Sequence, residues 1–493
     1  MAATDRSSLR RDTLSVGTSV VMCMAFMGPA TSVAFNTAPA AGGAGRALPF
    51  ALLLALVACL LVANTIAAFA RKLPTAGFAY TYNTRAFGPS GGFLSGWLLL
   101  IAYGMVGPML FSAIGAFGSD FLAAQFGVHI AWWVIAGIFV LVVWAINASG
   151  VSHSAKAAMI FLVIEVGVVL GLAATILGKG GDHGVALSVF DPANSLNGVS
   201  GLGTGMLWGV LMFIGFESVA TLGEEAKSAR RTVPLALFSA VIVIGAFYVF
   251  TAFASANGFA DGDALAADAS PWSTLSQRFW GGTAILTLTV MASQFANVIS
   301  GSNAIVRVLF AMGRESILPR ALGRTGARQT PVVALGAYMV FSALFALLVG
   351  LKYGPYGVYG FAGTVLGLGM VLIYIVMSVG VIRFYLREHR DEFSVVRHGV
   401  LPVLTALIML LPVYGQLHPA PAYPNNLGIW LILVWMLGGA GYLLYLRARR
   451  PEIIGAMGAA FEETAEPASG TGAGAGKDTA PDPEPGLGAG RVG

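Results

Sequence analysis

The strongest constraint on the fold of this chain is a series of long apolar runs that are separated by short polar segments. A transmembrane helix needs about 20 consecutive, mostly apolar residues, and a backbone inside the bilayer must satisfy its own hydrogen bonds. Hydrophobic residues make up 57% of the chain and charged residues only 10%, against about 25% charged in soluble domains. We therefore predict an all-α polytopic membrane protein with 12 transmembrane helices. The expected spans lie near residues 14–39, 47–70, 92–123, 131–149, 157–178, 203–223, 234–256, 282–312, 331–350, 357–383, 400–417 and 427–446.

Positive charges predict how the chain is oriented, because Lys and Arg are enriched in cytoplasmic loops. With a cytoplasmic N-terminus, 21 Lys and Arg residues fall on the inner side of the predicted spans and four on the outer side. The four outer residues are Arg46, Lys179, Arg278 and Lys352. We expect a multi-pass protein of the cell membrane with both termini in the cytoplasm. The basic residues are scattered over short loops, so the partner they indicate is the lipid bilayer and not a nucleic acid.

The composition changes along the chain and divides it into three parts. Residues 1–13 are expected to form a cytoplasmic N-terminal tail, and residues 14–447 a domain of twelve helices. Residues 448–493 are expected to form a disordered cytoplasmic C-terminal tail, because residues 466–493 hold mostly Ala, Gly, Pro, Thr and acidic residues. A passive tail is the preferred interpretation, and a tail that binds a regulator is the alternative.

One predicted span is interrupted by a glycine and a carboxylate. The segment Gly209–Leu237 begins as a membrane helix, places Gly215 and Glu217 inside the apolar run, and leaves through the charged residues 224–231. A carboxylate inside the bilayer is costly and indicates a functional site. A broken backbone at that depth is tolerated only where it faces protein or a water-filled cavity. The segment therefore predicts a substrate site near mid-membrane.

The first span contains a second interruption. The sequence MAFMGPATSVAFNTAP places Gly28 and Pro29 in mid-helix, where proline removes a backbone donor and disfavours helical geometry in the residue before it. The segments Met24–Gly28 and Leu211–Gly215 share a Phe and a Gly at one offset of 187 residues. Interrupted helices at corresponding positions of two halves are typical of transporters with inverted repeats. The alternative is that Gly-Pro only kinks a packed helix.

Three long segments carry a resemblance to a known family. GFESVATLGEEAKSARRTVP at 215–234 is similar to its sixth helix and the loop that follows. AGFAYTYNTRAFGPSGGFLSGW at 76–97 is similar to the connection between its second and third helices, and NAIVRVLFAMGRESILPRALGR at 303–324 to the end of its eighth. Over about residues 14–447 the chain resembles bacterial amino acid permeases of the amino acid–polyamine–organocation superfamily. The resemblance implies a secondary active transporter with the five-plus-five inverted repeat of the leucine-transporter type, broken helices 1 and 6, and two extra helices.

The two breaks offer complementary ends to a zwitterionic amino acid. Where the first helix resumes, near Thr31 and Ser32, free N–H groups and the positive helix end are expected to attract a carboxylate. Carbonyls of both breaks are expected to accept from the ammonium, and Phe216 is either a lid over the substrate or an ordinary packing contact. The family has a Gly-Ser/Thr-Gly run where this chain has Gly28-Pro29-Ala30-Thr31-Ser32, which shifts the carboxylate contact by a residue or two. The candidate substrate-binding residues of the breaks are Phe26, Met27, Gly28, Ala30, Thr31, Ser32, Phe213, Ile214, Gly215 and Phe216.

Polar residues on neighbouring spans complete the candidate site. Tyr103, Gln294 and Asn297 are placed to face the central cavity, or alternatively to form hydrogen bonds between helices. Glu217 could bind the amine or carry a proton, but anchoring the break is the preferred interpretation. Glu165 lies about nine residues into the fifth span with no cation near it in sequence. At this position proton-coupled members of the family have a lysine, so Glu165 is either a proton carrier, since burial favours a protonated carboxylate, or a structural acid that stabilises neighbouring helices.

The coupling ion is predicted to be a proton. Sodium is disfavoured, because sodium-dependent relatives present adjacent hydroxyl residues on the eighth helix, whereas Gly301 separates Ser300 from Ser302 here. The sequence contains no metal-ligand spacing, cofactor motif or nucleophile constellation, so we predict neither an enzyme nor a cofactor. The alternatives to a proton-coupled permease are an exchanger of amino acids or amines with the same fold and, from another class, a membrane sensor that does not transport.

Overall fold

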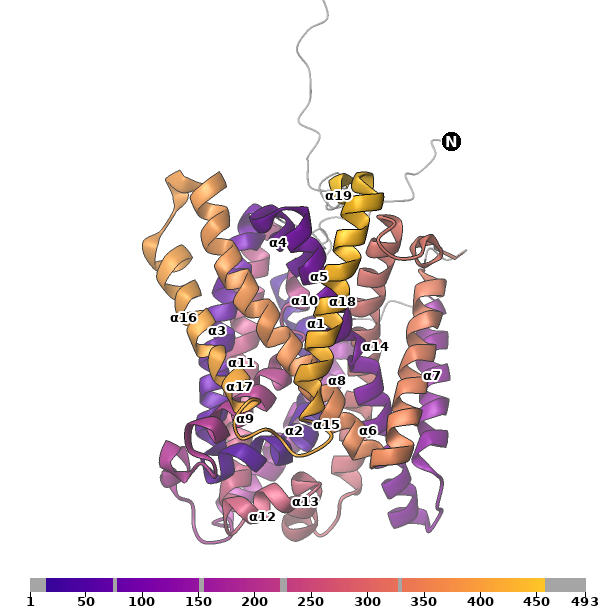
Figure 1. Ribbon diagram of the computed structural model, residues 1–493. Coiled ribbons are helices and arrows are strands. Elements are labelled where there is room, and N and C mark those ends of the chain that lie inside the picture. Colours follow the sequence, from indigo (N-terminus) through magenta and orange to yellow (C-terminus); the bar gives the residue numbers. More distant parts are fainter. Residues whose placement is uncertain (1–14, 74–77, 150–154, 222–227, 327–329, 457–493) are drawn as a thin grey trace, which may run out of the picture.

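The computed structural model describes residues 15–73, 78–149, 155–221, 228–326 and 330–456 (Figure 1). The predicted N-terminal tail at 1–13, the charged residues 224–227 and most of the predicted C-terminal tail lie outside these residues. All regular structure within the described ranges is helical, as predicted. After Arg449 the chain forms one further short helix, α19 (Pro451–Ala456).

Ten helical stretches of the described residues are long and apolar enough to cross a membrane. They are Val16–Lys72, Pro89–Phe126, Trp132–Ser149, Met159–Gly178, Gly198–Ala220, Arg230–Gly258, Ala284–Arg314, Val332–Glu388, Val395–Gly415 and Leu427–Arg449. The chain is therefore an integral membrane protein. The stretches Val16–Lys72 and Val332–Glu388 contain 57 residues each, and neither is one straight helix. In Val332–Glu388, Gly354 has a non-helical backbone with φ 73° and is followed by Pro355.

The first stretch breaks at the glycine and proline that the sequence singled out. Helix α1 (Val16–Met27) ends at Gly28, which adopts a left-handed conformation with φ 54°. Helix α2 (Pro29–Ala44) begins at Pro29, whose missing N–H needs no partner at the first helical position. After α2, a short 3₁₀ turn at Gly45–Ala47 leads into α3 (Leu48–Lys72), which is rich in the strong helix formers Leu and Ala.

The second break separates α9 (Gly198–Phe213) from the short helix α10 (Ser218–Thr221). Ile214 leaves helical geometry with ψ 126°, and Gly215 has φ 120°. Residues with side chains rarely adopt such positive φ values, so glycine permits this turn.

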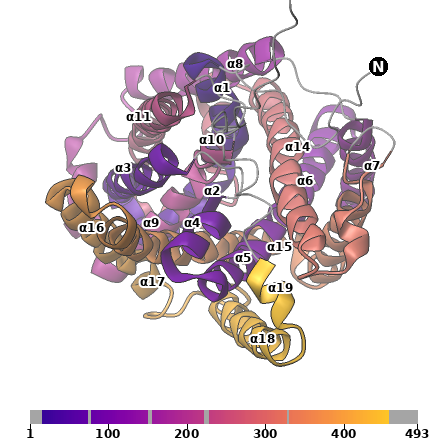
Figure 2. The same ribbon diagram turned by 90° about the horizontal axis from the view of Figure 1, so that it is seen from above.

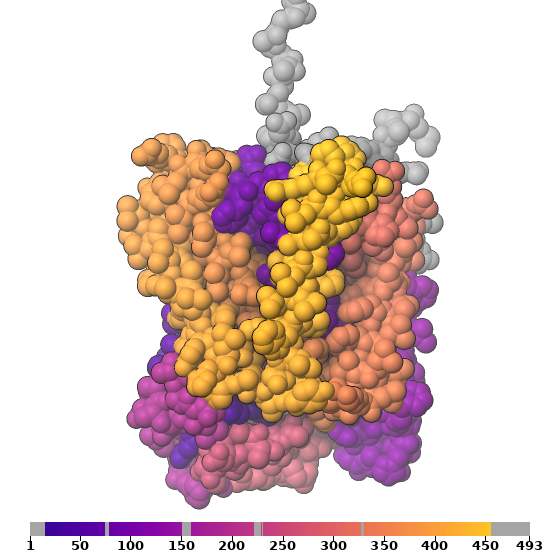
Figure 3. Space-filling model, viewed as in Figure 1, coloured from indigo at the N-terminus to yellow at the C-terminus, as the bar shows by residue number. Residues whose placement is uncertain are grey.

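The broken helices lie in the interior of the bundle. Viewed from above, α1, α2 and α10 are surrounded by longer helices (Figure 2). Helix α1 contacts α8 (Ala155–Gly178), α11 (Ala229–Gly258) and α14 (Ala284–Arg314), and α2 packs mainly against α9. Burial separates core from periphery: 94% of the most apolar window of Pro89–Phe126 is buried, but only 22% of that of Leu427–Arg449. Figure 3 shows this last helix, in yellow, standing on the outer face.

The other helices complete the bundle and cap its ends. They are α4 (Phe78–Phe87), α5 (Pro89–Gly104), α6 (Val106–Phe126), α7 (Trp132–Ser149), α12 (Gly262–Ala267), α13 (Pro271–Trp280), α15 (Val332–Glu388), α16 (Leu401–Ile408), α17 (Leu410–Gly415) and α18 (Leu427–Arg449), with 3₁₀ turns at Leu187–Phe190, Pro192–Asn194, Arg320–Gly323 and Arg390–Glu392 and a π-helical turn at Val395–Val400.

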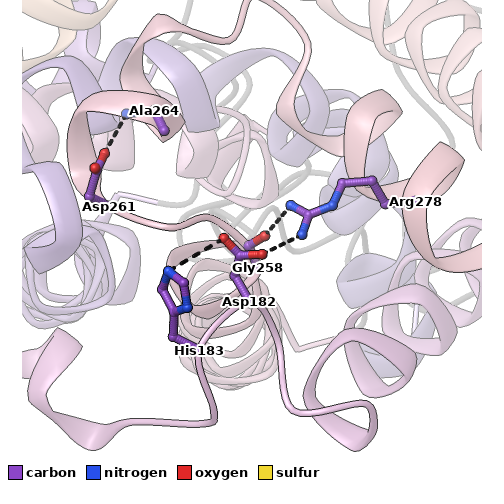
Figure 4. A network of polar contacts seen from close by, with 6 residues as sticks. All are labelled: Asp182, His183, Gly258, Asp261, Ala264 and Arg278. Carbon is purple, nitrogen blue, oxygen red and sulfur yellow. Dashed lines mark hydrogen bonds and ion pairs between the residues drawn. The ribbon is translucent and has the colours of Figure 1, made fainter.

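Helices α12 and α13 cover the end of the bundle opposite the N-terminus (Figures 1 and 3). Arg278 of α13 donates to the Asp182 carboxylate at 2.6 Å and to the Gly258 carbonyl at 2.8 Å (Figure 4). Asp261 caps α12 by accepting from the N–H of Ala264 at 2.8 Å. The contacts of Arg278 tie α13 to the loop after α8 and to the end of α11.

Candidate functional site

The N-terminus of α2 forms one side of the candidate site, and its backbone donors are already engaged. Pro29 has no N–H, and the N–H of Ala30 donates to Glu165 Oε2 at 3.3 Å. The N–H of Thr31 donates to Ser293 Oγ at 3.3 Å, and that of Ser32 to the Gly28 carbonyl at 2.8 Å. The sequence predicted free donors at Thr31 and Ser32, but in this conformation each of them has a partner.

Glu165 projects from α8 to this helix end. Its side chain is buried, with 6% exposed, and within the described residues no ion pair joins it to Lys or Arg. The positive end of the α2 dipole and the N–H of Ala30 take the place of a cation. Glu165 therefore contacts the first break directly, which its position in the sequence did not reveal.

Glu217 holds the second break. It is fully buried and uses both carboxylate oxygens: Oε2 accepts from the N–H of Gly215 at 3.0 Å, and Oε1 accepts from the hydroxyl of Tyr103 at 2.5 Å. One bond fixes the broken backbone and the other links it to α5. Anchoring of the break stays a prediction for Glu217, and these two bonds are the contacts that it requires.

The two breaks contact each other. The thiol of Cys23 in α1 donates to the carbonyl of Phe216 at 3.3 Å. A Cβ on Gly215 would lie 3.2 Å from the backbone nitrogen of Met27, so glycine allows this approach. Within the first break, the hydroxyl of Ser32 donates to the carbonyl of Met27 at 2.8 Å. The breaks are thus parts of one site.

A small cavity of about 30 Å³ lies beside the breaks. This volume holds about one water molecule, so an amino acid needs the surrounding helices to move apart. Six residues that the sequence predicted for substrate binding line it: Phe26, Met27, Thr31, Ser32, Ile214 and Asn297. Seven lining residues were missed: Asn36, Val106, Met109, Leu110, Leu211, Tyr359 and Leu366.

The remaining candidates lie outside the lining: Gly28, Ala30, Phe213, Gly215, Phe216, Tyr103 and Gln294. Phe216 is fully buried, and its ring lies 6.1 Å from that of Tyr374. The carbonyl of Phe213, proposed to accept from an ammonium, accepts from the N–H of Phe216 at 3.1 Å. Gln294 is fully buried, and neither atom of its amide has a hydrogen-bond partner among the described residues.

Asn36 and Tyr359 close one side of the cavity. The Tyr359 hydroxyl donates to Asn36 Oδ1 at 2.8 Å, linking α2 to α15. Phe35 packs beside them, with its ring centroid 4.9 Å from that of Tyr359 and 4.5 Å from that of Phe117. One sequence signal could have found Asn36: it lies four residues after Ser32, and residues four apart share a helix face.

The cavity wall has two chemical characters. Hydroxyl and amide groups come from α2, Asn297 and Tyr359, whereas apolar side chains come from the end of α1, from α6, from the end of α9 and from Leu366 of α15. None of the lining residues is acidic or basic. Among the described residues there is also no group of three or more His, Cys, Asp or Glu that could hold a metal ion. The cavity suits a ligand that carries both polar groups and an uncharged, apolar group.

A family comparison decides what kind of protein carries this site. The family model described as "Amino acid permease" matches residues 14–440. The chain belongs to the amino acid permease family. It is therefore a secondary membrane transporter and not an enzyme, and the resemblance inferred from its sequence motifs is confirmed.

Relatives within this permease family move several kinds of solute. The chain is 25% identical to the branched-chain amino acid permease BcaP of Lactococcus lactis subsp. cremoris, covering 89% of this chain and 94% of that protein. It is 26% identical to the low-affinity putrescine importer PlaP of Escherichia coli, with 79% and 84% covered. It is 25% identical to the serine/threonine exchanger SteT of Bacillus subtilis, with 80% and 86% covered. The family is thus clear, whereas the substrate has to be argued from this permease's own cavity.

Proposed function

We propose that this permease carries a neutral amino acid with an aliphatic side chain across the cell membrane, together with a proton. The observation that carries the proposal is the uncharged cavity at the two breaks, whose lining combines polar and apolar side chains. An ammonium side chain would find no carboxylate there, and an acidic side chain would find no Lys or Arg. Burying an unpaired charge is expensive, so the lining selects against both.

The backbone of the breaks supplies groups for the ends common to all amino acids. Thr31 and Ser32 belong to the positive end of α2, which favours a carboxylate. The carbonyl of Met27 ends α1 and accepts from the hydroxyl of Ser32, which an ammonium can replace. Asn297 lies against Gly28 and offers both an amide donor and an acceptor.

Transport by alternating access requires barriers on both sides of the cavity. On one side, Asn36 and Tyr359 join α2 to α15. On the other side, the breaks close on each other through Cys23 and Phe216, and Glu217 ties the second break to Tyr103. The cavity beside these contacts has room for about one water molecule, so it cannot hold an amino acid in this conformation. Substrate entry then requires one of these contacts to open at a time.

The proposed topology has twelve spans with both termini in the cytoplasm. One straight helix of 57 residues would measure about 85 Å, far more than the thickness of a bilayer. We therefore divide the first 57-residue stretch at the turn Gly45–Ala47 and the second at Gly354, so that the ten stretches become twelve spans. The breaks in the first and sixth of these spans match a five-plus-five inverted repeat within residues 14–447. The excess of Lys and Arg in the inner loops supports the orientation.

Glu165 is the proposed proton carrier. It is a buried carboxylate with no paired cation among the described residues, and it contacts the break that binds substrate. In this proposal a proton on Glu165 supplies the positive charge that a sodium ion or a lysine supplies in other members of the family. A sodium site would need ligands from α14, where Gly301 separates Ser300 from Ser302.

Uptake into proteoliposomes with a panel of labelled amino acids tests this function. Leucine, valine and isoleucine should enter, and an inwardly directed proton gradient should drive their accumulation. Lysine, glutamate and putrescine should not compete. Uptake that ignores the pH gradient but requires internal substrate would favour exchange, as the name of the serine/threonine relative suggests. Transport of charged substrates alone would contradict the proposed specificity.

A further inference from the structure

The N-terminus of α2 already binds a carboxylate, and that carboxylate belongs to the protein. Glu165 Oε2 accepts from the N–H of Ala30. The N–H of Thr31 donates to Ser293 Oγ, and the N–H of Ser32 donates to the Gly28 carbonyl. A substrate carboxylate arriving at this helix end meets no free donor. It must displace an internal partner, and among these partners Glu165 is the one with the same chemistry as the substrate.

Glu165 and the cavity reach this helix end from different sides. Thr31 and Ser32 line the cavity, whereas Glu165 is absent from its lining and approaches from α8. Ala30 precedes the two lining residues directly in the chain, so its N–H lies at the boundary. The positive end of a helix amounts to about half an elementary charge, which is too little to neutralise two carboxylates. Two ionised carboxylates at this helix end would therefore repel each other.

We propose that Glu165 is a stand-in for the carboxylate of the substrate and releases the α2 N-terminus when it takes up a proton. The hydrogen bond from the N–H of Ala30 to Glu165 breaks, a proton from the aqueous side adds to the Glu165 carboxylate, and the N–H of Ala30 then donates to the substrate. One proton thus binds with each amino acid. This inference rests on the proposed function and adds the step by which the two ligands become coupled.

The surroundings of Glu165 contain few other titratable groups. Tyr248 from α11 lies close enough to Glu165 to interact with its charge. The basic residues of α14 begin at Arg307, 14 residues or about 20 Å beyond Ser293. Along α8, Lys156 lies nine residues or about 14 Å before Glu165, and Lys179 lies 14 residues or about 20 Å after it. Arg278 of α13 is held by Asp182. Among the described residues, Glu165 is therefore the acidic group in contact with this helix end.

Equilibrium binding of leucine to the purified, full-length protein tests the proposal. Calorimetry at pH 7.5 in two buffers of different ionisation enthalpy measures the protons bound with each leucine. We expect about one proton, and a dissociation constant at least fivefold lower at pH 5.5 than at pH 7.5. This measurement needs only the wild-type chain, so it decides the question even where a variant fails to fold.

Two variants locate the proton. Glu165→Gln keeps an acceptor for the N–H of Ala30 but carries no charge, so it should bind leucine equally at both pH values, close to the affinity of the wild type at pH 5.5, without proton uptake. Asp191→Asn changes an exposed carboxylate in a distant loop and should behave as the wild type does.

The outcomes separate this inference from the proposed function. Leucine binding without proton uptake, or proton uptake that persists in Glu165→Gln, would overturn the stand-in role and leave neutral amino acid transport intact. No binding of leucine by the wild type at either pH, together with no uptake of any neutral amino acid, would remove the proposed function itself.

Discussion

Gly215 packs against Phe26, so the two helix breaks meet with no side chain from position 215 between them. A Cβ at this position would lie 3.1 Å from Phe26 Cγ and 3.2 Å from the backbone nitrogen of Met27. The backbone at Gly215 also has φ 120°, which residues with side chains rarely adopt. Because the contact is this close, a displacement of one break must move the other.

Gly215→Ala should therefore impair both stability and transport. The strained backbone alone costs about 1–3 kcal/mol, and the close contact adds to it. We expect a lower midpoint of thermal unfolding in detergent and at least tenfold slower leucine uptake. The matched control is Gly42→Ala in α2, where a Cβ meets no atom within 4 Å. Equal behaviour of the two variants would contradict the proposed contact between the breaks.

Tyr103→Phe should destabilise the second break. The change removes the donor to Glu217 Oε1 and leaves a buried carboxylate oxygen without its partner, at a cost of about 1–3 kcal/mol. Tyr82→Phe is a control of the same chemistry, because the Tyr82 hydroxyl is buried and has no hydrogen-bond partner among the described residues. Thermal unfolding should separate the two variants. A shift as large in Tyr82→Phe would show that the Glu217 contact is not responsible.

Tyr359→Phe should weaken the closure between α2 and α15. Loss of its hydrogen bond to Asn36 removes about 1 kcal/mol, so the apparent affinity for leucine should change about fivefold while the protein stays folded. Initial uptake rates over a range of leucine concentrations measure the effect. Tyr445→Phe, on an exposed tyrosine of α18, should transport as the wild type does. An unchanged KM and kcat in Tyr359→Phe would exclude the Asn36 contact from the transport cycle.

Met109→Ala should shift the substrate preference. Shortening this side chain enlarges the cavity beside the apolar residues. The ratio of kcat/KM for phenylalanine to kcat/KM for leucine should therefore rise about tenfold. Competition between the two labelled amino acids gives the ratio directly. The control is Met159→Ala, which shortens a methionine on the exposed face of α8. If both variants keep the ratio of the wild type, the cavity beside the breaks is not the substrate side-chain site.

Local rules made the breaks predictable from the sequence. Proline lacks a backbone donor and glycine tolerates positive φ, so Gly28, Pro29 and Gly215 indicated where α1 ends and where α9 ends. All the candidates in the lining except Asn297 lie within four residues of these positions. Glu165 and Glu217 stood out because carboxylates are costly in apolar spans.

The partners of these residues depend on tertiary packing and could not be predicted. Tyr359 and Asn36 are 323 residues apart, and their contact requires a particular rotation of α15 against α2. The bond between Ala30 and Glu165 likewise depends on how α8 faces the first break. Hydropathy predicts the length of a membrane helix but not its rotation about its own axis. The hydrogen-bond partners of the α2 backbone donors and the apolar residues that α6 adds to the cavity therefore emerged only in the structure.

The most direct test of the account is the accumulation of labelled leucine in proteoliposomes that hold a pH gradient, acidic outside, in sodium-free buffer. Wild-type protein should concentrate leucine inside, and collapsing the gradient with a protonophore should release it. Glu165→Gln should lose this accumulation yet still exchange external for internal leucine. Accumulation by Glu165→Gln that equals the wild type would contradict the central claim that a proton on Glu165 drives transport.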